Sequence, residues 1–142
     1  MKAITIHQPW AAMIAAGWKT IETRTHDRFI GLEGQTIAIH ASARVPSDDQ
    51  YIFAMRYREG ARGQYVDGLQ IARGCVVAVA HVVDARWLFG CFCREAMCEA
   101  YGKFGLFLAD VVRLKDPIKA RGRQGIWTLP PEVEAQVRRQ VG

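Results

Sequence analysis

The apolar residues of this chain fall into short runs that predict β-strands. Residues 75–83 are rich in β-branched side chains and almost continuously apolar, which is typical of a central strand buried on both faces. Shorter runs with alternating or apolar character predict further strands at residues 3–6, 21–25, 35–42, 104–114 and 125–129.

Three helices are predicted between and after these strands. The first begins near Pro9, because a first turn does not use the donor that proline lacks, and it ends before Gly17, where a left-handed residue closes a helix. The second runs from a polar cap within residues 47–49 to about residue 58. The third begins at Pro131 and carries acidic residues early and arginines late, which suits the helix dipole.

Strands joined by single helices, without a regular βαβ repeat, indicate an α+β fold with a barrel-like sheet covered by helices. We expect residues 1–142 to form one domain, which is long enough to bury a core without disulfides or metals. Residues 59–68 hold three glycines and little apolar periodicity, so we expect a surface loop there that serves as a lid or a binding loop.

Charge and hydropathy narrow the class of protein. Lys and Arg outnumber Asp and Glu by 19 to 14, and the net charge of +5 favours an anionic partner without identifying it. The chain begins with no signal-peptide pattern, and it has no apolar run of the roughly 20 residues that cross a bilayer. We therefore expect a soluble, cytoplasmic protein with no membrane partner.

The four cysteines are unevenly spaced, since Cys91, Cys93 and Cys98 are clustered and Cys75 stands apart. The three clustered thiols and His81 are one candidate set of zinc ligands. Paired zinc ligands, however, are usually separated by about two to four residues, and no second pair follows. Ordinary reduced thiols are the simpler interpretation, so we predict no metal and no cofactor.

Lys19, Glu22 and Arg24 are the strongest candidates for a charged site. In a strand, Glu22 and Arg24 lie on one face, and Lys19 stands where the strand begins. Such a trio can bind part of a nucleotide, because the two cations engage phosphate or carbonyl oxygens and the carboxylate accepts from an amine or hydroxyl. From the residues alone, a structural ion pair at the rim of the sheet is the simpler interpretation.

His40 and Ser42 share the polar face of the strand predicted at residues 35–42. His40 is therefore a candidate to hydrogen-bond a ligand or to shuttle a proton, and the alternative is a buried histidine that the backbone satisfies. A catalytic triad built on both residues is not expected, because side chains two apart on a strand point in parallel.

A basic segment near the C-terminus is a second candidate contact surface. Arg121 and Arg123 follow two lysines and precede Trp127, and this charge and aromatic content is typical of surfaces that bind nucleic acid. The alternative is a solvated loop followed by a tryptophan in the core.

Four segments together resemble a known family: AITIHQPWA at residues 3–11, GWKTIETR at residues 17–24, IHAS at residues 39–42 and ARGRQGIW at residues 120–127. They resemble the ASCH domain (activating signal cointegrator homology), a relative of PUA domains, over about residues 2–129. The G-x-K-x-x-E-x-R signature of the family is met by Gly17, Lys19, Glu22 and Arg24. The resemblance implies a PUA-like, mostly antiparallel β-barrel with helices around an opening that the signature strand borders.

The resemblance also implies a function, because ASCH domains and their PUA relatives are generally regarded as RNA-interaction modules. The first expectation is RNA or nucleotide binding through Lys19, Glu22, Arg24, His40, Ser42, Arg121 and Arg123. The alternative is a small hydrolase: a ribonuclease with Lys19, Glu22, Arg24 and His40 as catalytic residues, or an enzyme that deacylates a modified nucleoside. The deacylases of the family use a threonine where Glu22 stands and a glutamate that residues 75–83 lack. A protein partner ranks third, since the family name comes from a transcription coactivator.

Overall fold

The computed structural model describes residues 1–56 and 71–142, so the loop predicted at residues 59–68 lies outside the described part. Within that part, six strands form one sheet in the order β2-β5-β4-β3-β1-β6. β1 (Lys2–Ile6) pairs in parallel with β3 (Thr36–Ala41), and the remaining pairs of this sheet are antiparallel. β2 (Ile21–Arg24) and β6 (Trp127–Thr128) form its two edges.

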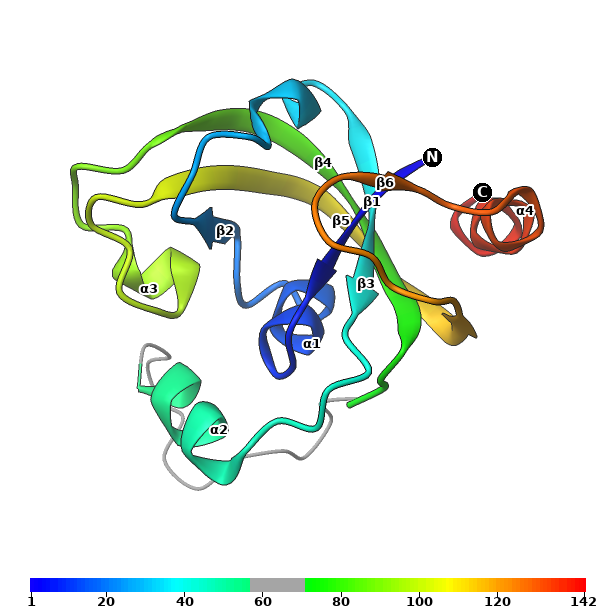
Figure 1. The fold of residues 1–142 in the computed structure, drawn as a ribbon, viewed down its shortest axis with the longest axis horizontal. Helices are drawn as coiled ribbons and strands as arrows, with labels where there is room; N and C mark the ends of the chain where they lie inside the picture. The colour runs from blue at the N-terminus through cyan, green and yellow to red at the C-terminus, as the bar shows by residue number, and fades with distance from the viewer. Residues whose placement is uncertain (57–70) are drawn as a thin grey trace.

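The two longest strands, β4 (Cys75–Trp87) and β5 (Phe104–Lys119), form the middle of the sheet. Their pairing contains three register shifts, and irregularities of this kind bend a strand pair and increase its twist. The pair therefore curves, and α1 (Trp10–Ala15) packs against its concave side (Figure 1).

The prediction of a central strand at residues 75–83 is confirmed, because both faces of β4 are covered over most of that run. On one face, Val77 and Ala80 belong to a core cluster that also contains residues of α1 and of the 3-10 helix η1 (Ile30–Leu32). On the other face, Val76 and Val79 belong to a cluster with residues of α4 (Pro131–Val141). A strand that is buried on both faces requires the continuous apolar run that the sequence displays.

The fold is α+β, as predicted. Its sheet, however, is not the closed barrel that the resemblance implies. No pairing joins β2 to β6, which remain separate edges of the sheet. β2 has only four residues, and β6 has two, which pair with Lys2 and Ala3 alone. Closure requires two edges that offer backbone donors and acceptors in register over several residues, and these edges are too short to do so. The prediction of a barrel is therefore wrong, and the sheet is open between β2 and β6.

Some strands and helices begin or end at other residues than predicted, and for strands the pairing partner determines the end. Gly17 has a φ of 77°, the left-handed conformation expected for the residue that closes α1. β5 continues past residue 114, because Ile118 and Lys119 pair with the first residues of β4. The sequence pattern predicts neither η1 nor α3 (Cys93–Ala96), since a single turn is too short to show a helical period. α2 (Asp48–Met55) begins within the predicted cap, and α4 begins at Pro131 as predicted.

The described helices are all short, and none of them combines the length and the apolarity that a bilayer span requires.

Candidate functional site

A cavity of about 870 Å³ lies between the end of β2 and the segment that leads into β6, where the sheet is open. This volume is within the range of about 300–1,000 Å³ that is usual for small-molecule and cofactor sites. Among the described residues, the charged and titratable side chains of the lining are all arginines and histidines, and no Asp or Glu contributes. They are Arg24, Arg28, Arg121, Arg123, His7, His26 and His40.

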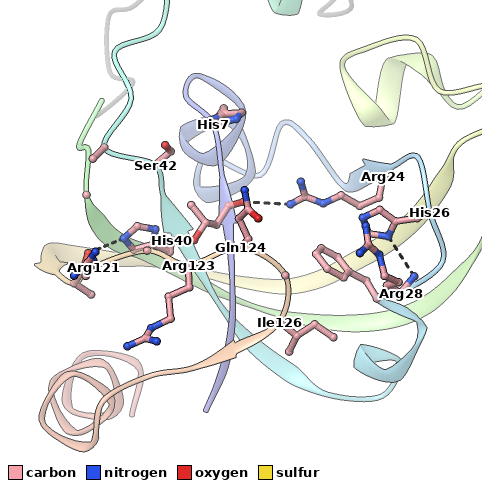
Figure 2. Close-up of a pocket in the computed structure, with 17 residues that line it drawn as sticks. His7, Arg24, His26, Arg28, His40, Ser42, Arg121, Arg123, Gln124 and Ile126 are labelled. Atoms are coloured by element: carbon pink, nitrogen blue, oxygen red, sulfur yellow. Dashed lines mark hydrogen bonds between the residues drawn. The ribbon is translucent and has the colours of Figure 1, made fainter.

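Two sides of the cavity come from segments that are distant in the sequence (Figure 2). Arg24, His26 and Arg28 extend from the end of β2 and the turn after it, and His40 and Ser42 come from β3 and the residue after it. Residues 120–126 pass between these two sides on their way to β6. The open part of the sheet thus collects basic groups from three segments.

Five of the seven predicted binding residues line this cavity: Arg24, His40, Ser42, Arg121 and Arg123. Lys19 and Glu22 do not belong to its lining. Both are buried, with 1% and 6% of their surface exposed. The structure therefore brings most of the predicted set together but separates the first two residues of the charged trio from the cavity.

Lys19, Glu22 and Arg24 form a chain of ionic contacts that ends at the cavity. The ammonium of Lys19 donates a hydrogen bond to the carbonyl oxygen of Ala96 in α3, and its Nζ lies 3.5 Å from Glu22 Oε2. The other carboxylate oxygen, Oε1, lies 3.3 Å from a terminal nitrogen of Arg24. Glu22 and Arg24 therefore share a face of β2, as the alternation predicts, and only Arg24 reaches the cavity.

The guanidinium of Arg24 bridges the open part of the sheet. The nitrogen that contacts Glu22 also donates to the carbonyl oxygen of Thr5 in β1 at 3.3 Å. β6 pairs only with Lys2 and Ala3, so the outer side of β1 at Thr5 is available to this arginine. The Cζ of Arg24 lies 4.9 Å from the centre of the Phe29 ring, at cation–π distance. Its Nε is buried and has no hydrogen-bond partner among the described residues, and a quarter of the side chain remains exposed.

His40 is almost fully buried, with 1% of its surface exposed, and the backbone satisfies one of its ring nitrogens. Nε2 lies 2.8 Å from the carbonyl oxygen of Ala120, which can only accept, so Nε2 carries the proton. Nδ1 is buried and has no hydrogen-bond partner in the part of the chain that the structure describes, and the ring meets Trp127 edge to face at 5.5 Å. Of the two interpretations that the sequence leaves open, the geometry supports the buried histidine for Nε2 and leaves Nδ1 as an unused acceptor.

Burial lowers the pKa of His40 below its ordinary value of 6.5, and the bond to Ala120 opposes this shift in part. In the unfolded chain the imidazole gains a proton as the pH falls through 6.5, whereas the folded state resists that proton until a lower pH. The contribution of neutral His40 to stability is therefore complete above pH 6.5 and is lost as the pH falls below it.

We expect the free energy of unfolding to decrease by about 1 kcal/mol more in the wild-type chain than in a His40→Gln variant when the pH falls from about 7.5 to about 5.5. Urea titrations at several pH values measure this difference, and the effects of His7, His26 and His81 cancel because both chains retain them. Glu134, whose pKa is lowered by its hydrogen bonds to the N-terminal ammonium and Arg138, changes stability only below its ordinary pKa of 4.5. Parallel pH profiles for the two chains would contradict the assignment of a neutral, buried His40.

The segment at residues 120–126 lies directly against His40. A Cβ placed on Gly122 would approach His40 Cε1 to 2.6 Å and Nδ1 to 2.8 Å, so only glycine fits there without movement of its neighbours. Trp127, which follows, is buried, and its Nε1 donates to the hydroxyl of Thr5 at 3.2 Å. Trp127 is thus a core residue rather than a stacking platform, whereas Arg121 and Arg123 are exposed at the cavity.

His26 and Arg28 are lining residues that the sequence analysis does not single out. A signal for them exists, because Arg24, His26 and Arg28 are spaced two apart and continue the polar face of the signature strand. The chain leaves β2 after Arg24 and turns toward η1, yet both later residues still reach the same cavity.

The cysteine cluster lies outside the cavity lining. All four cysteines are free thiols, and Cys98 is buried with its Sγ 3.3 Å from the hydroxyl of Thr23. Across residues 1–56 and 71–142, no three His, Cys, Asp or Glu side chains gather where they could share a metal ion.

Comparisons with known proteins concern both the sequence and the fold. The family model of the ASCH domain matches residues 4–109. A crystal structure of ASCH from Zymomonas mobilis superposes with a TM-score of 0.62 at 18% identity and covers 97% of this chain and 93% of that one. Two single-residue variants of that protein give TM-scores of 0.62 and 0.61 at 17% and 16% identity, over 97% of this chain and 94% and 96% of theirs. No curated protein matches the sequence.

Proposed function

The chain belongs to the ASCH domain family, and from this premise we propose that it binds single-stranded RNA and seats one nucleotide in the cavity between β2 and the segment before β6. The family is PUA-like and is generally linked to RNA binding. The proposal for this chain depends on one observation, which is the charge of the cavity lining.

Four arginines and three histidines of the described chain meet at this cavity without a carboxylate. Phosphate contacts dominate the affinity of proteins for nucleic acids, and arginine suits them because its planar fork can donate two hydrogen bonds to one phosphate. Glu22, the carboxylate that contacts Arg24, is also engaged by Lys19 and does not line the cavity. These contacts favour an anionic ligand with more than one phosphate.

The shape of the site favours a single strand over a duplex. A cavity accepts an unpaired nucleotide that leaves the stack, whereas a double helix presents only its surface. Ser42 and Gln124 line the cavity with polar side chains that can read the edge of a base, and Ile126 adds an apolar contact. Polar and apolar groups are thus both available beside the arginines.

Binding is favoured over hydrolysis because the four catalytic candidates are not together at the cavity. Arg24 and His40 line it, but Lys19 and Glu22 are buried in contact with each other and do not. A lysine nucleophile must approach the substrate, and Lys19 instead donates to the Ala96 carbonyl.

Fluorescence anisotropy with a labelled single-stranded RNA tests the proposal. If three or four phosphates are neutralised, the logarithm of the affinity falls with the logarithm of salt with a slope of about −2 to −3, so a fourfold rise in salt weakens binding by about 15- to 60-fold. A duplex of the same sequence is expected to bind more weakly. Absence of binding at low salt, or an affinity that ignores salt, contradicts the proposal.

A matched pair of double variants separates the cavity from overall charge. Replacing Arg121 and Arg123 by alanine removes two positive charges at the cavity, and replacing Arg138 and Arg139 removes two from the exposed side of α4. Only the first pair is expected to make the salt slope shallower, by about 1.4.

A further inference from the structure

The ionic chain of Lys19, Glu22 and Arg24 ends in a guanidinium at the cavity wall. We propose that Arg24 binds one phosphate of the RNA and that Lys19 and Glu22 are positioning residues, which hold this guanidinium without touching the ligand. This inference rests on the proposed function of the cavity. It assigns to Lys19 and Glu22 of the signature a role that differs from direct ligand binding.

Arg24 is held by protein groups on one side and faces the cavity with the rest of its side chain. A single terminal nitrogen contacts both Glu22 Oε1 and the Thr5 carbonyl, each at 3.3 Å, and the Phe29 ring lies against the guanidinium. Arginine has five N–H donors in one plane, and the contacts to Glu22 and Thr5 both involve one terminal nitrogen. Donors of this group therefore remain for an anion in the cavity.

Glu22 can fix Arg24 because Glu22 is itself fixed. Its second carboxylate oxygen lies 3.5 Å from Lys19 Nζ, and the Lys19 ammonium donates to the Ala96 carbonyl in α3. The side chains of Lys19 and Glu22 are only 2% and 8% exposed, so water does not compete strongly for these contacts. A guanidinium that is already held in place loses less conformational freedom when it binds phosphate.

The charges of the trio match this division of roles. Two cations and one carboxylate leave a net charge of +1, and the only member of the trio at the cavity is cationic. One phosphate would therefore be neutralised at Arg24.

The variant Glu22→Gln distinguishes positioning from overall electrostatics, because the two accounts predict opposite signs. The substitution removes a negative charge, so the electrostatic account predicts tighter RNA binding. If Glu22 positions Arg24, binding instead weakens by roughly 3- to 10-fold and the salt slope becomes shallower by up to about 0.7, the contribution of one phosphate on a single strand. Asp84→Asn is the matched control, because Asp84 pairs with Arg86 outside the cavity lining.

A double-mutant cycle tests whether Glu22 acts through Arg24. Arg24→Ala is expected to weaken binding, and adding Glu22→Gln to it is expected to change the affinity no further. Additive losses would mean that Glu22 acts on the fold as a whole, and the positioning role would be wrong. Should the Glu22→Gln chain fail to fold, Glu22→Asp keeps the charge, shortens the reach to Arg24 and is read in the same cycle.

The two proposals fail in different ways. If the wild-type chain binds no RNA, the proposed function is wrong. If the wild-type chain binds RNA, Arg24→Ala weakens binding and Glu22→Gln leaves it equal or tighter, the function stands and the positioning role is wrong. A thermal unfolding curve of each variant shows whether it is folded at the assay temperature, so that the binding measurements compare folded chains.

Discussion

Replacing Lys19 by alanine is expected to lower the free energy of unfolding by about 3–5 kcal/mol, the range seen when one partner of a buried ion pair is removed. The Lys19 side chain is 2% exposed, donates to Ala96 and pairs with Glu22. The variant deprives the Ala96 carbonyl of this donor, leaves Glu22 with one cation in place of two and opens a void where the lysine stem packs. Urea denaturation followed by tryptophan fluorescence measures the loss.

Two further variants identify the source of this loss. Lys19→Met keeps the stem and removes the charge, so the difference between the methionine and alanine variants reports the packing of the stem. Arg138→Ala breaks an ion pair with Glu134 in which the arginine is 65% exposed, and its expected effect is below about 1 kcal/mol. A Lys19→Ala chain as stable as this control would mean that the ammonium is not a buried partner, and it would return Lys19 to the candidate ligand-binding groups.

The signature segment shows what the sequence can predict about the site. Alternation along a strand places Glu22 and Arg24 on one face, and the structure confirms this through their direct contact. The burial of Lys19 depends on Ala96, 77 residues further along the chain, in a helix of four residues. A one-turn helix has no periodic pattern, so no signal in the sequence indicates the group that covers the lysine.

His40 shows a second limit of prediction from sequence: the pattern of a strand does not show which segment covers its polar face. The alternation correctly places His40 opposite the apolar residues of β3 that pack toward α1. For the basic segment before Trp127, the sequence leaves open a contact surface or a solvated loop, and part of this segment packs against the ring through Ala120 and Gly122. Burial of a side chain on a strand therefore depends on a loop whose path the local pattern does not determine.

The open sheet also depends on contacts that the local sequence pattern does not show. Strand propensity predicts residues 21–25 and 125–129 as strands, but only four and two residues respectively pair in the sheet. Pairing needs a partner with unused backbone groups, and beyond Ala3 the outer side of β1 meets the Arg24 guanidinium at Thr5 instead of β6. The place where the predicted barrel fails to close is also the place where the basic side chains meet.

Replacing Gly122 by alanine is expected to weaken RNA binding by about tenfold and to lower the free energy of unfolding by about 1–3 kcal/mol, the usual effect of overpacking. The added Cβ would lie 2.6 Å from His40 Cε1, 2.8 Å from His40 Nδ1 and 3.0 Å from the Thr5 hydroxyl. His40 has little room to move, since Ala120 binds its Nε2 and Trp127 lies against its ring. The segment itself must therefore shift, and Arg121 and Arg123 shift with it.

A glycine and a histidine of the same site provide the controls for this result. A Cβ added at Gly125 meets no heavy atom of residues 1–56 and 71–142 within 4 Å, and Gly125 has a φ of 70°. Gly125→Ala is therefore expected to lose about 1–2 kcal/mol of stability through backbone strain and to retain most of its affinity. In a His40→Ala background the main clash is absent, so adding Gly122→Ala is expected to lower stability much less than it does in the wild-type chain. Anisotropy titrations and urea unfolding measure both effects. Equal losses in the two backgrounds would show that contact with the His40 ring is not what requires glycine at this position.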